Sequence, residues 1–165
     1  MKEIFLSGKI GSGMRMIVDD IDYDVLFKYK WHAFRGAYKV GGNLYAASKI
    51  KGRYVLAHRL IFGEPDGKHI DHINGNGLDN RRENLRVCTP SENHRNTRVS
   101  RKNNTTGYKG VSFEKQTGRY RAHINPIAGG RTKHLGRFDT PREAAECYNE
   151  MAKKLFGDFA QLNEF

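Results

Sequence analysis

The segment from His69 to Asn96, HIDHINGNGLDNRRENLRVCTPSENHRN, is the feature that most restricts how this chain can fold. It is rich in His, Asp, Asn and Gly, and it holds few of the large apolar residues that build a hydrophobic core. The Asn-Gly pair occurs twice and favours tight turns, because Gly and Asn accept positive φ angles at low cost. The segment is therefore either a long polar surface loop or a site built from small polar side chains.

Strand and helix signals give this segment a local structure. KHID and LRVC are typical of short strands, and the NGNG turns lie between them. Thr89, Pro90 and Glu92 fit the cap, the first position and the third position of a helix, so a short helix is expected from Pro90. Strand, loop, strand and helix together predict a ββα unit.

A ββα unit can bring Asp71 and His72 close to Asn93, which lies one turn into the expected helix. Asp71 and Asn93 offer oxygen ligands, which suit a hard cation such as Mg²⁺ or Mn²⁺ better than zinc. A histidine is suited to act as a general base near neutral pH, and Asn84 could fix the His72 tautomer by accepting from the other ring N–H. The set predicts metal-assisted hydrolysis of a phosphodiester bond, without structural zinc.

Two points in this interpretation stay open. Adjacent residues on a regular strand point to opposite faces, so Asp71 and His72 share a site only if the strand bends there. His69 is the alternative, because it shares a strand face with Asp71. His58 is expected to pack or cap at a helix start rather than to touch phosphate.

The whole segment resembles the HNH endonuclease family, specifically its phage and intron-encoded homing endonucleases. Their hallmark is an Asp-His pair, a central Asn and an Asn on the helix. The matching residues are Asp71, His72, Asn84 and Asn93. The resemblance extends upstream to GSGMRMIVDDIDYDVLFKYKWHA and AHRLIFG, and it implies a one-metal nuclease that leaves 5′-phosphate and 3′-hydroxyl ends.

The part of the chain before this segment is predicted to be rich in strands. Several stretches with many aromatic and β-branched residues are expected to be strands: 3–10, 14–20, 29–40, 43–50 and 53–58. A short helix is expected within 23–31, and one or two helical turns at 57–63 are expected to end at Gly63. DIDYD at 20–24 is interpreted as a solvated turn, since the glycine and glutamate of a calcium loop are missing.

The part from Tyr108 to Phe165 has a different pattern. Strands are expected at 108–114, 118–125 and 131–138, and a helix at 140–157 begins with a capping box from Thr140 to Glu143. Strand alternation predicts that four apolar residues face this helix: Val111, Ala122, Ile124 and Leu135.

This part resembles the plant ethylene-response-factor (Apetala-two) DNA-binding domain over nearly all of 108–163. The match includes the LGRFDTPREAA corner and the closing GDFAQLN. In that family a three-stranded sheet backed by a helix enters the major groove, and several Arg and Trp residues lie on its reading face. This chain has other residues there: Ser112, Glu114, His123 and His134. The resemblance therefore implies a DNA-reading sheet, but the plant target sequence does not carry over.

A net charge of +11 favours a polyanionic partner, and double-stranded DNA is the expected one. No membrane partner is expected, since no apolar run approaches the roughly 20 residues of a membrane span. No small-molecule cofactor is expected either. Residues 98–107 are interpreted as a basic linker, since no acidic residue occurs between Glu92 and Glu114. The expected DNA contacts are Arg95, Arg98, Arg101, Lys102, Lys109, Ser112, Arg119, Arg121, His123, Asn125, Arg131, Lys133 and His134.

The sequence thus predicts an α+β protein of two domains. Residues 1–97 form a β-rich HNH nuclease domain with its ββα-metal core at about 67–97, and residues 108–165 form a three-stranded antiparallel sheet packed on one helix. Cys88 and Cys147 are expected to be reduced. We expect a monomeric, site-specific homing endonuclease that nicks duplex DNA in the cytoplasm, of a host cell if phage-encoded. The alternatives are a DNA-binding regulator with an inactive nuclease site and an RNA-directed protein.

Overall fold

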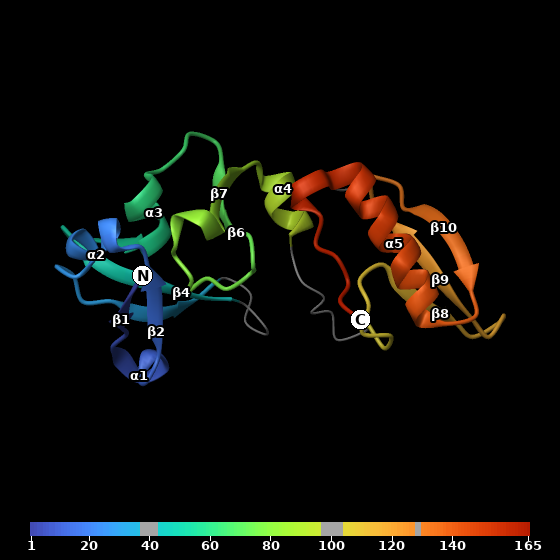
Figure 1. Ribbon diagram of the computed structural model, residues 1–165, viewed down its shortest axis with the longest axis horizontal. Helices are drawn as coiled ribbons and strands as arrows, with labels where there is room; N and C mark the ends of the chain where they lie inside the picture. The colour runs from blue at the N-terminus through green and yellow to red at the C-terminus, as the bar shows by residue number, and fades with distance from the viewer. Residues whose placement is uncertain (37–42, 97–103, 128–129) are drawn as a thin grey trace. The chain divides into compact units, whose positions relative to one another are not determined.

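The computed structural model describes residues 1–36, 43–96, 104–127 and 130–165. These residues divide into two compact units, Met1–Pro90 and Ser91–Phe165. The described part of the chain holds four small antiparallel sheets with helices between them (Figure 1), so the predicted mixed α+β class is confirmed. No described helix is long and apolar enough to cross a lipid bilayer.

The first unit begins with an antiparallel hairpin of β1 (Lys2–Phe5) and β2 (Arg15–Val18), with the short helix α1 (Gly8–Gly11) between them. The single strand expected over 3–10 is therefore wrong beyond Phe5. Gly8 takes a positive φ of 84°, which turns the chain out of the sheet and into α1.

Helix α2 (Asp20–Leu26) replaces the solvated turn expected at 20–24 and begins before the helix expected within 23–31. Asp20 and Asp22 lie in its first turn, where negative charge stabilises a helix N-terminus. The helix ends where Trp31 folds back, since the Trp31 Nε1–H donates to the Leu26 carbonyl at 2.8 Å.

A three-stranded antiparallel sheet follows, in the order β3–β4–β5 (His32–Arg35, Leu44–Ile50 and Arg53–Leu56). Residues 37–40 of the strand expected at 29–40 lie outside the described residues, and β3 begins only at His32. Helix α3 (Ala57–Phe62) starts directly after β5 and ends at Gly63, as predicted. The hydrophobic core joins this sheet to the hairpin and to α2 through Ile4, Leu6, Met16, Val18, Leu26, Trp31, Ala33, Ala46 and Ala57.

The polar segment contains the strands and the helix that its turn and cap signals predict. Strand β6 (His69–His72) pairs antiparallel with β7 (Leu85–Cys88), the 3₁₀ turn η1 (Arg82–Asn84) precedes β7, and α4 (Pro90–Arg95) follows. The boundary between the two units falls at the start of α4, so Asn93 belongs to the second unit. The packing of β6, β7 and α4 as one ββα unit stays a prediction.

The second unit contains a sheet in the order β10–β9–β8 (Lys133–Phe138, Arg119–Ile124 and Val111–Glu114) and helix α5 (Pro141–Phe156), followed by the turn η2 (Gly157–Phe159). The predicted capping box of α5 is confirmed, because the Thr140 and Glu143 side chains each accept from the other residue's backbone N–H. The residues predicted to face the helix, Val111, Ala122, Ile124 and Leu135, pack against α5 in two hydrophobic clusters. In Figure 1, α5 lies across the sheet.

Most of the predicted linker, 98–103, lies outside the described residues, together with the expected DNA contacts Arg98, Arg101 and Lys102. Its last residues form an ordered turn. Asn104 Oδ1 accepts from the backbone N–H groups of Thr106 and Gly107, each at 3.0 Å, as asparagine does in tight turns. The domain limits at 97 and 108 stay a proposal. Both cysteines, Cys88 and Cys147, are free thiols.

Candidate functional site

Asp71 and His72 are both buried at the end of β6, with 6% and 4% of their surface exposed. The pairing with β7 is regular through His72, so no bulge turns the two side chains to one face within the strand. The strand ends there in a tight turn, since Gly75 N–H donates to the His72 carbonyl at 2.8 Å. His69, the alternative partner of Asp71, has an exposed side chain.

The Asp71 carboxylate is paired with Arg86, its cross-strand neighbour on β7. Asp71 Oδ2 accepts from Arg86 Nε at 3.0 Å and from Nη2 at 2.8 Å. Both side chains are largely buried, at 7% and 14% exposed, so the pair is screened little by water. A cation at Asp71 therefore has to share the carboxylate with a guanidinium group.

The His72 ring packs against two other rings. Its centroid lies 4.9 Å from that of His58, edge to face, and 5.7 Å from that of Tyr45. Burial lowers the pKa of His72, although the nearby Asn80 and Asp71 act in the opposite direction. The ring is therefore neutral at neutral pH, which is the form that can take a proton from water.

His58 is a buried residue at the start of α3, as predicted for a histidine that packs there. Burial, followed by the proximity of His72, lowers the pKa of His58 to about 3. Its buried Nδ1 has no hydrogen-bond partner among the described residues. His58 is therefore neutral at neutral pH, and its ring places no positive charge beside His72.

Asn80 is the neighbour of His72 that the sequence did not indicate. Its side chain is fully buried, and its Oδ1 lies 3.4 Å from His72 Nε2. If Asn80 Oδ1 accepts in this contact, His72 Nε2 is the nitrogen that carries the proton. No short-range signal marks Asn80, because the contact depends on how the loop between β6 and η1 folds back.

Asn84 binds two backbone groups of the loop between β6 and η1. Its Oδ1 accepts from the Asn74 backbone N–H at 2.9 Å, and its Nδ2 donates to the Asp79 carbonyl at 2.8 Å. The Asn84 amide therefore joins the two ends of the loop. Its oxygen and one of its two N–H groups bind the loop backbone. The expected role of Asn84 in orienting the His72 ring stays a prediction.

Further contacts hold the same loop in place. Asp79 accepts from Arg81 Nε and Nη2, each at 2.8 Å, and from Asn74 Nδ2 at 2.8 Å. The hydrogen bonds from Arg81 hold the pKa of Asp79 below its usual range. The Asn80 backbone N–H donates to the Ile17 carbonyl of β2 at 2.8 Å. The loop that carries Asn80 is thus anchored on both sides.

Replacement of Asn84 by alanine is expected to destabilise the first unit by about 2–4 kcal/mol, because one buried and one partly buried backbone group lose their partner. Urea unfolding followed by the fluorescence of Trp31, the single tryptophan of the chain, measures this effect. Asn76→Ala is the matched control, since the Asn76 side chain accepts an exposed bond in the same loop. Equal losses in the two variants would contradict the bridging role of Asn84.

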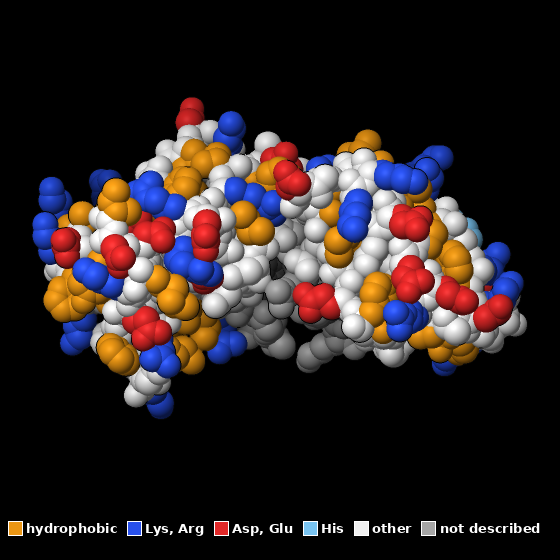
Figure 2. Space-filling model, viewed as in Figure 1, with side chains coloured by type: hydrophobic (Ala, Val, Ile, Leu, Met, Phe, Trp, Pro, Cys, Tyr) orange, Lys and Arg blue, Asp and Glu red, His pale blue; other side chains and the backbone are white. Residues whose placement is uncertain are grey.

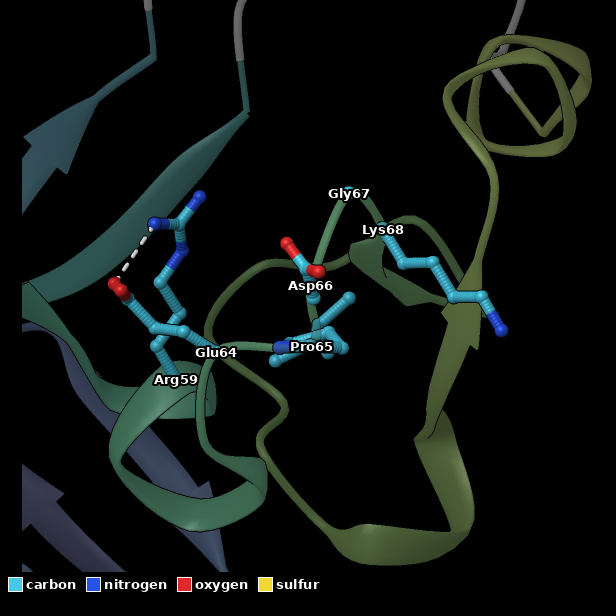
Figure 3. A pocket seen from close by; sticks show the side chains of 7 residues that line it. Arg59, Glu64, Pro65, Asp66, Gly67 and Lys68 are labelled. Atoms are coloured by element: carbon cyan, nitrogen blue, oxygen red, sulfur yellow. Dashed lines mark hydrogen bonds and ion pairs between the residues drawn. The ribbon is translucent and has the colours of Figure 1, made fainter.

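A cavity of about 310 Å³ lies beside the loop between α3 and β6 (Figure 3). Arg59 Nη1 pairs with Glu64 Oε1 at 3.1 Å at its edge, and the Lys68 side chain points away from this pair. Side chains of both charges line the cavity, and neither Asp71 nor His72 is among them. We therefore do not assign it to phosphodiester chemistry.

The residues predicted to hold a metal ion are Asp71, through its carboxylate, and Asn93, through its amide oxygen. Over the described ranges of the chain, no three His, Cys, Asp or Glu side chains lie close enough together to hold a metal ion. Two oxygen donors fit a hard divalent cation that keeps its other positions for water and phosphate oxygens. The position of Asn93 beside Asp71 stays a prediction, because Asn93 lies in the second unit.

The expected DNA contacts of the second unit lie largely on strands and turns that water can reach. Six of them are exposed: Ser112, Arg119, Asn125, Arg131, Lys133 and His134. Arg121 and His123 are partly buried, and the buried Nε of Arg121 has no partner among the described residues. Figure 2 shows Asp and Glu among the Lys and Arg over the face that carries α5.

Arg137 is a basic residue on this sheet that the sequence reading missed. A β-bulge lies between His134 and Gly136 on β10. Beyond the bulge, Arg137 pairs with Arg121 of β9, on the face of the sheet away from α5. Arg137 Nε donates to Glu114 Oε2 at 2.7 Å, and this contact lowers the pKa of Glu114 to about 2. The face thus carries a carboxylate that stays charged.

Arg95 and Lys109 already have partners within the second unit. The Arg95 guanidinium lies over the Phe156 ring at 4.7 Å, and Lys109 Nζ donates to the Arg95 carbonyl at 2.6 Å. These contacts secure the end of α4. A role of Arg95 or Lys109 in DNA binding stays a prediction. A DNA phosphate would have to replace or share the contacts that these side chains make within the unit.

Comparison with known proteins adds independent information. Residues 55–95, which include Asp71, His72, Asn84 and Asn93, match a family model described as HNH endonuclease. An uncharacterized HNH endonuclease of Acanthamoeba polyphaga mimivirus is 31% identical over 155 residues, which cover 93% of this chain and 77% of that protein. Protein 3.8 of Escherichia phage T7 is 35% identical over 98 residues, or 59% of this chain and 78% of that protein.

A third similarity is to plant proteins. An AP2-like ethylene-responsive transcription factor of Arabidopsis thaliana is 35% identical over 123 residues, which cover 74% of this chain but 24% of that protein. This partial match is consistent with an AP2-type domain within the chain.

Proposed function

Because the chain belongs to the HNH endonuclease family, we propose that it is a site-specific endonuclease that hydrolyses phosphodiester bonds of double-stranded DNA. The observation that supports this most strongly is the neutral, buried His72 directly after the Asp71 carboxylate at the end of β6. A neutral general base and a carboxylate that can bind a metal are two components that metal-assisted hydrolysis can use.

In the proposed reaction, His72 is the general base. With Nε2–H donating to Asn80, the other ring nitrogen would take a proton from the attacking water. The water oxygen forms a bond to phosphorus while the bond between phosphorus and the 3′-oxygen breaks. The 3′-oxygen then takes a proton from solvent water, which leaves 5′-phosphate and 3′-hydroxyl ends. A bound Mg²⁺ or Mn²⁺, held by Asp71 and Asn93, would stabilise negative charge on the phosphate and on the leaving oxygen.

Asn84 contributes as a positioning residue in this proposal. It binds the backbone of Asn74 and Asp79, and so it holds the loop on which Asn80 lies. The Asn80 amide in turn sets the tautomer of His72. The central asparagine of the motif thus acts on the base through the loop.

The second unit is proposed to read the DNA sequence through the face of β8–β10 away from α5. The similarity to a plant transcription factor and the exposed basic residues of the sheet support this role. Arg119, Arg131 and Lys133 would contact phosphates, and the partly buried Arg121 would contact a base. A separate reading unit supplies the specificity that a small nuclease site lacks.

One nuclease site cuts one strand at each engagement, so we propose that the monomer nicks its target. A homing role, with action in the cytoplasm of a host cell, belongs to the same proposal. The alternative is a DNA-binding regulator with an inactive nuclease site. The Arg86–Asp71 ion pair favours this alternative, because it occupies the carboxylate proposed for the metal.

Metal removal provides the first test. Supercoiled plasmids carrying candidate target fragments are expected to become open circles with Mg²⁺ or Mn²⁺ and to stay supercoiled with EDTA, because charge on the leaving oxygen is then not stabilised. Gel electrophoresis measures the conversion, and end mapping gives the strand. Tight, salt-sensitive binding without nicking would identify the regulator. Cleavage of RNA with no effect on duplex DNA would contradict the proposal.

A further inference from the structure

The stretch of chain from Val25 to Gly63 carries eight Lys and Arg residues and no Asp or Glu. It includes the β3–β4–β5 sheet of the first unit. Clustered Lys and Arg side chains at a surface attract a polyanion over the range of a Debye length. The proposed cleavage chemistry uses none of these basic residues.

Three of these lysines line one open cavity of about 450 Å³. Lys28 and Lys30 come from the segment before β3, and Lys49 comes from β4, so the positive groups approach the cavity from two elements. None of the described residues that line it is acidic. None of the three lysines belongs to an ion pair within the described part of the chain.

Two rings border the same cavity. Tyr54 is 73% exposed, and its ring meets His32 edge to face with centroids 5.9 Å apart. An exposed aromatic ring beside unpaired ammonium groups can pack against a sugar or a base while the lysines meet phosphates. The cavity therefore fits a nucleic-acid backbone better than a small neutral molecule.

Strand register relates this cavity to the proposed nuclease site. Tyr45 and Lys49 are four residues apart on β4, so their side chains lie on the same face of the sheet. Tyr45 contacts the His72 ring, and Lys49 is paired with Tyr54 on β5. Four residues of strand span about 13 Å, which corresponds to roughly four base-pair rises of duplex DNA.

We propose that Lys28, Lys30 and Lys49 bind phosphates of the DNA strand that enters the nuclease site, a few nucleotides from the bond that is cut. This inference rests on the proposed endonuclease function, because it takes the strand at His72 as its reference. The lysines act as point charges that release counterions from the backbone, so they raise affinity without choosing a sequence. Sequence specificity would come from the β8–β10 sheet of the second unit.

The test compares two triple variants that remove the same charge. K28Q/K30Q/K49Q removes the cavity lysines, and K9Q/K153Q/K154Q removes three exposed lysines elsewhere. Binding to a duplex target is measured by fluorescence anisotropy in EDTA, at several salt concentrations. The cavity variant is expected to bind at least about tenfold more weakly than the control near 150 mM salt. Its slope of log K against log salt should shrink by about 0.9 for each lost phosphate contact.

Two further measurements keep the result interpretable. The K28R/K30R/K49R variant should restore the salt slope, and Trp31 fluorescence should show that the glutamine variant is folded. Single methylphosphonate substitutions about three to five nucleotides from the cut should weaken binding of the natural chain but not of the glutamine variant. This map on the natural chain decides the question if the glutamine variant does not fold.

Equal affinities and slopes for the two triple variants would overturn the proposal. A loss confined to RNA duplexes would overturn it as well, because the occupant would then be another class of molecule. The binding assay contains no metal, so it does not depend on cleavage. If the natural chain binds DNA through the cavity lysines but never nicks it, only the proposed endonuclease activity is disproved. If the chain nicks DNA and the lysine substitutions do not weaken binding, only the proposed phosphate contacts are disproved.

Discussion

Replacement of His72 by alanine is expected to slow DNA nicking by about 10²–10⁴-fold, the usual contribution of a general base. The variant lacks the nitrogen that takes the proton from water, while the Asp71 carboxylate and the reading sheet are unchanged. Single-turnover nicking of a supercoiled target measures the rate, and anisotropy in EDTA measures affinity. Affinity should stay within about twofold of the natural chain, since His72 is 4% exposed and carries no positive charge for phosphates.

His69→Ala is the matched control for His72→Ala. His69 lies on the same strand, but its side chain is exposed, so its loss should change the nicking rate by less than about threefold. Thermal unfolding of both variants shows whether loss of the buried ring affects the fold. Nicking that persists at the natural rate in His72→Ala would point to another base or to a contaminating nuclease. A rate that falls only in His69→Ala would make His69 the base.

Replacement of Gly110 by alanine is expected to destabilise the second unit by about 2–5 kcal/mol, enough to unfold much of it. Gly110 has a φ of 74°, and a Cβ there would overlap the Tyr148 ring and lie 2.7 Å from the His123 carbonyl oxygen. Tyr148 is 4% exposed, so its ring has no room to move aside. The variant should therefore lose its preference for the target sequence, while Trp31 in the first unit unfolds as before.

Gly118→Ala separates backbone strain from overlap. Gly118 has a similar φ of 69°, but a Cβ there would meet nothing within 4 Å. Its replacement should cost only about 1–2 kcal/mol, the cost of the left-handed conformation. Far-UV circular dichroism in urea follows the second unit, and competition between target and random duplex measures specificity. Equal losses in the two variants would show that contact with Tyr148 does not matter.

Several elements of the fold could be predicted because their causes act within a few residues. Thr140 and Glu143 cap α5, Gly63 ends α3, and turn residues separate the strands of the second unit. The predictions for the first unit were less accurate. The bend after Phe5 depends on Gly8, and the end of α2 depends on a bond from Trp31, five residues beyond Leu26.

In the candidate site, too, the residue types could be predicted from the sequence and the contacts between distant residues could not. Asp71, His72, Asn84 and Asn93 could be singled out because their chemical types occur in a recognisable order. Their partners could not, since each contact joins segments that lie apart in the chain. Arg86 reaches Asp71 only because β6 pairs with β7. The ion pair between Asp22 and Arg82, 60 residues apart, likewise appears in no local pattern.

The sequence by itself predicted which side chains could perform chemistry, showed where α5 begins and favoured a polyanionic partner. These properties follow from residue type, short-range spacing and net charge, which do not depend on how distant segments pack. Only the tertiary structure decided that His72 is buried and neutral, that Asn80 lies against its ring, and that Arg86 binds the Asp71 carboxylate. Burial and contacts between distant segments set protonation and hydrogen bonding, and both arise only when the chain has folded.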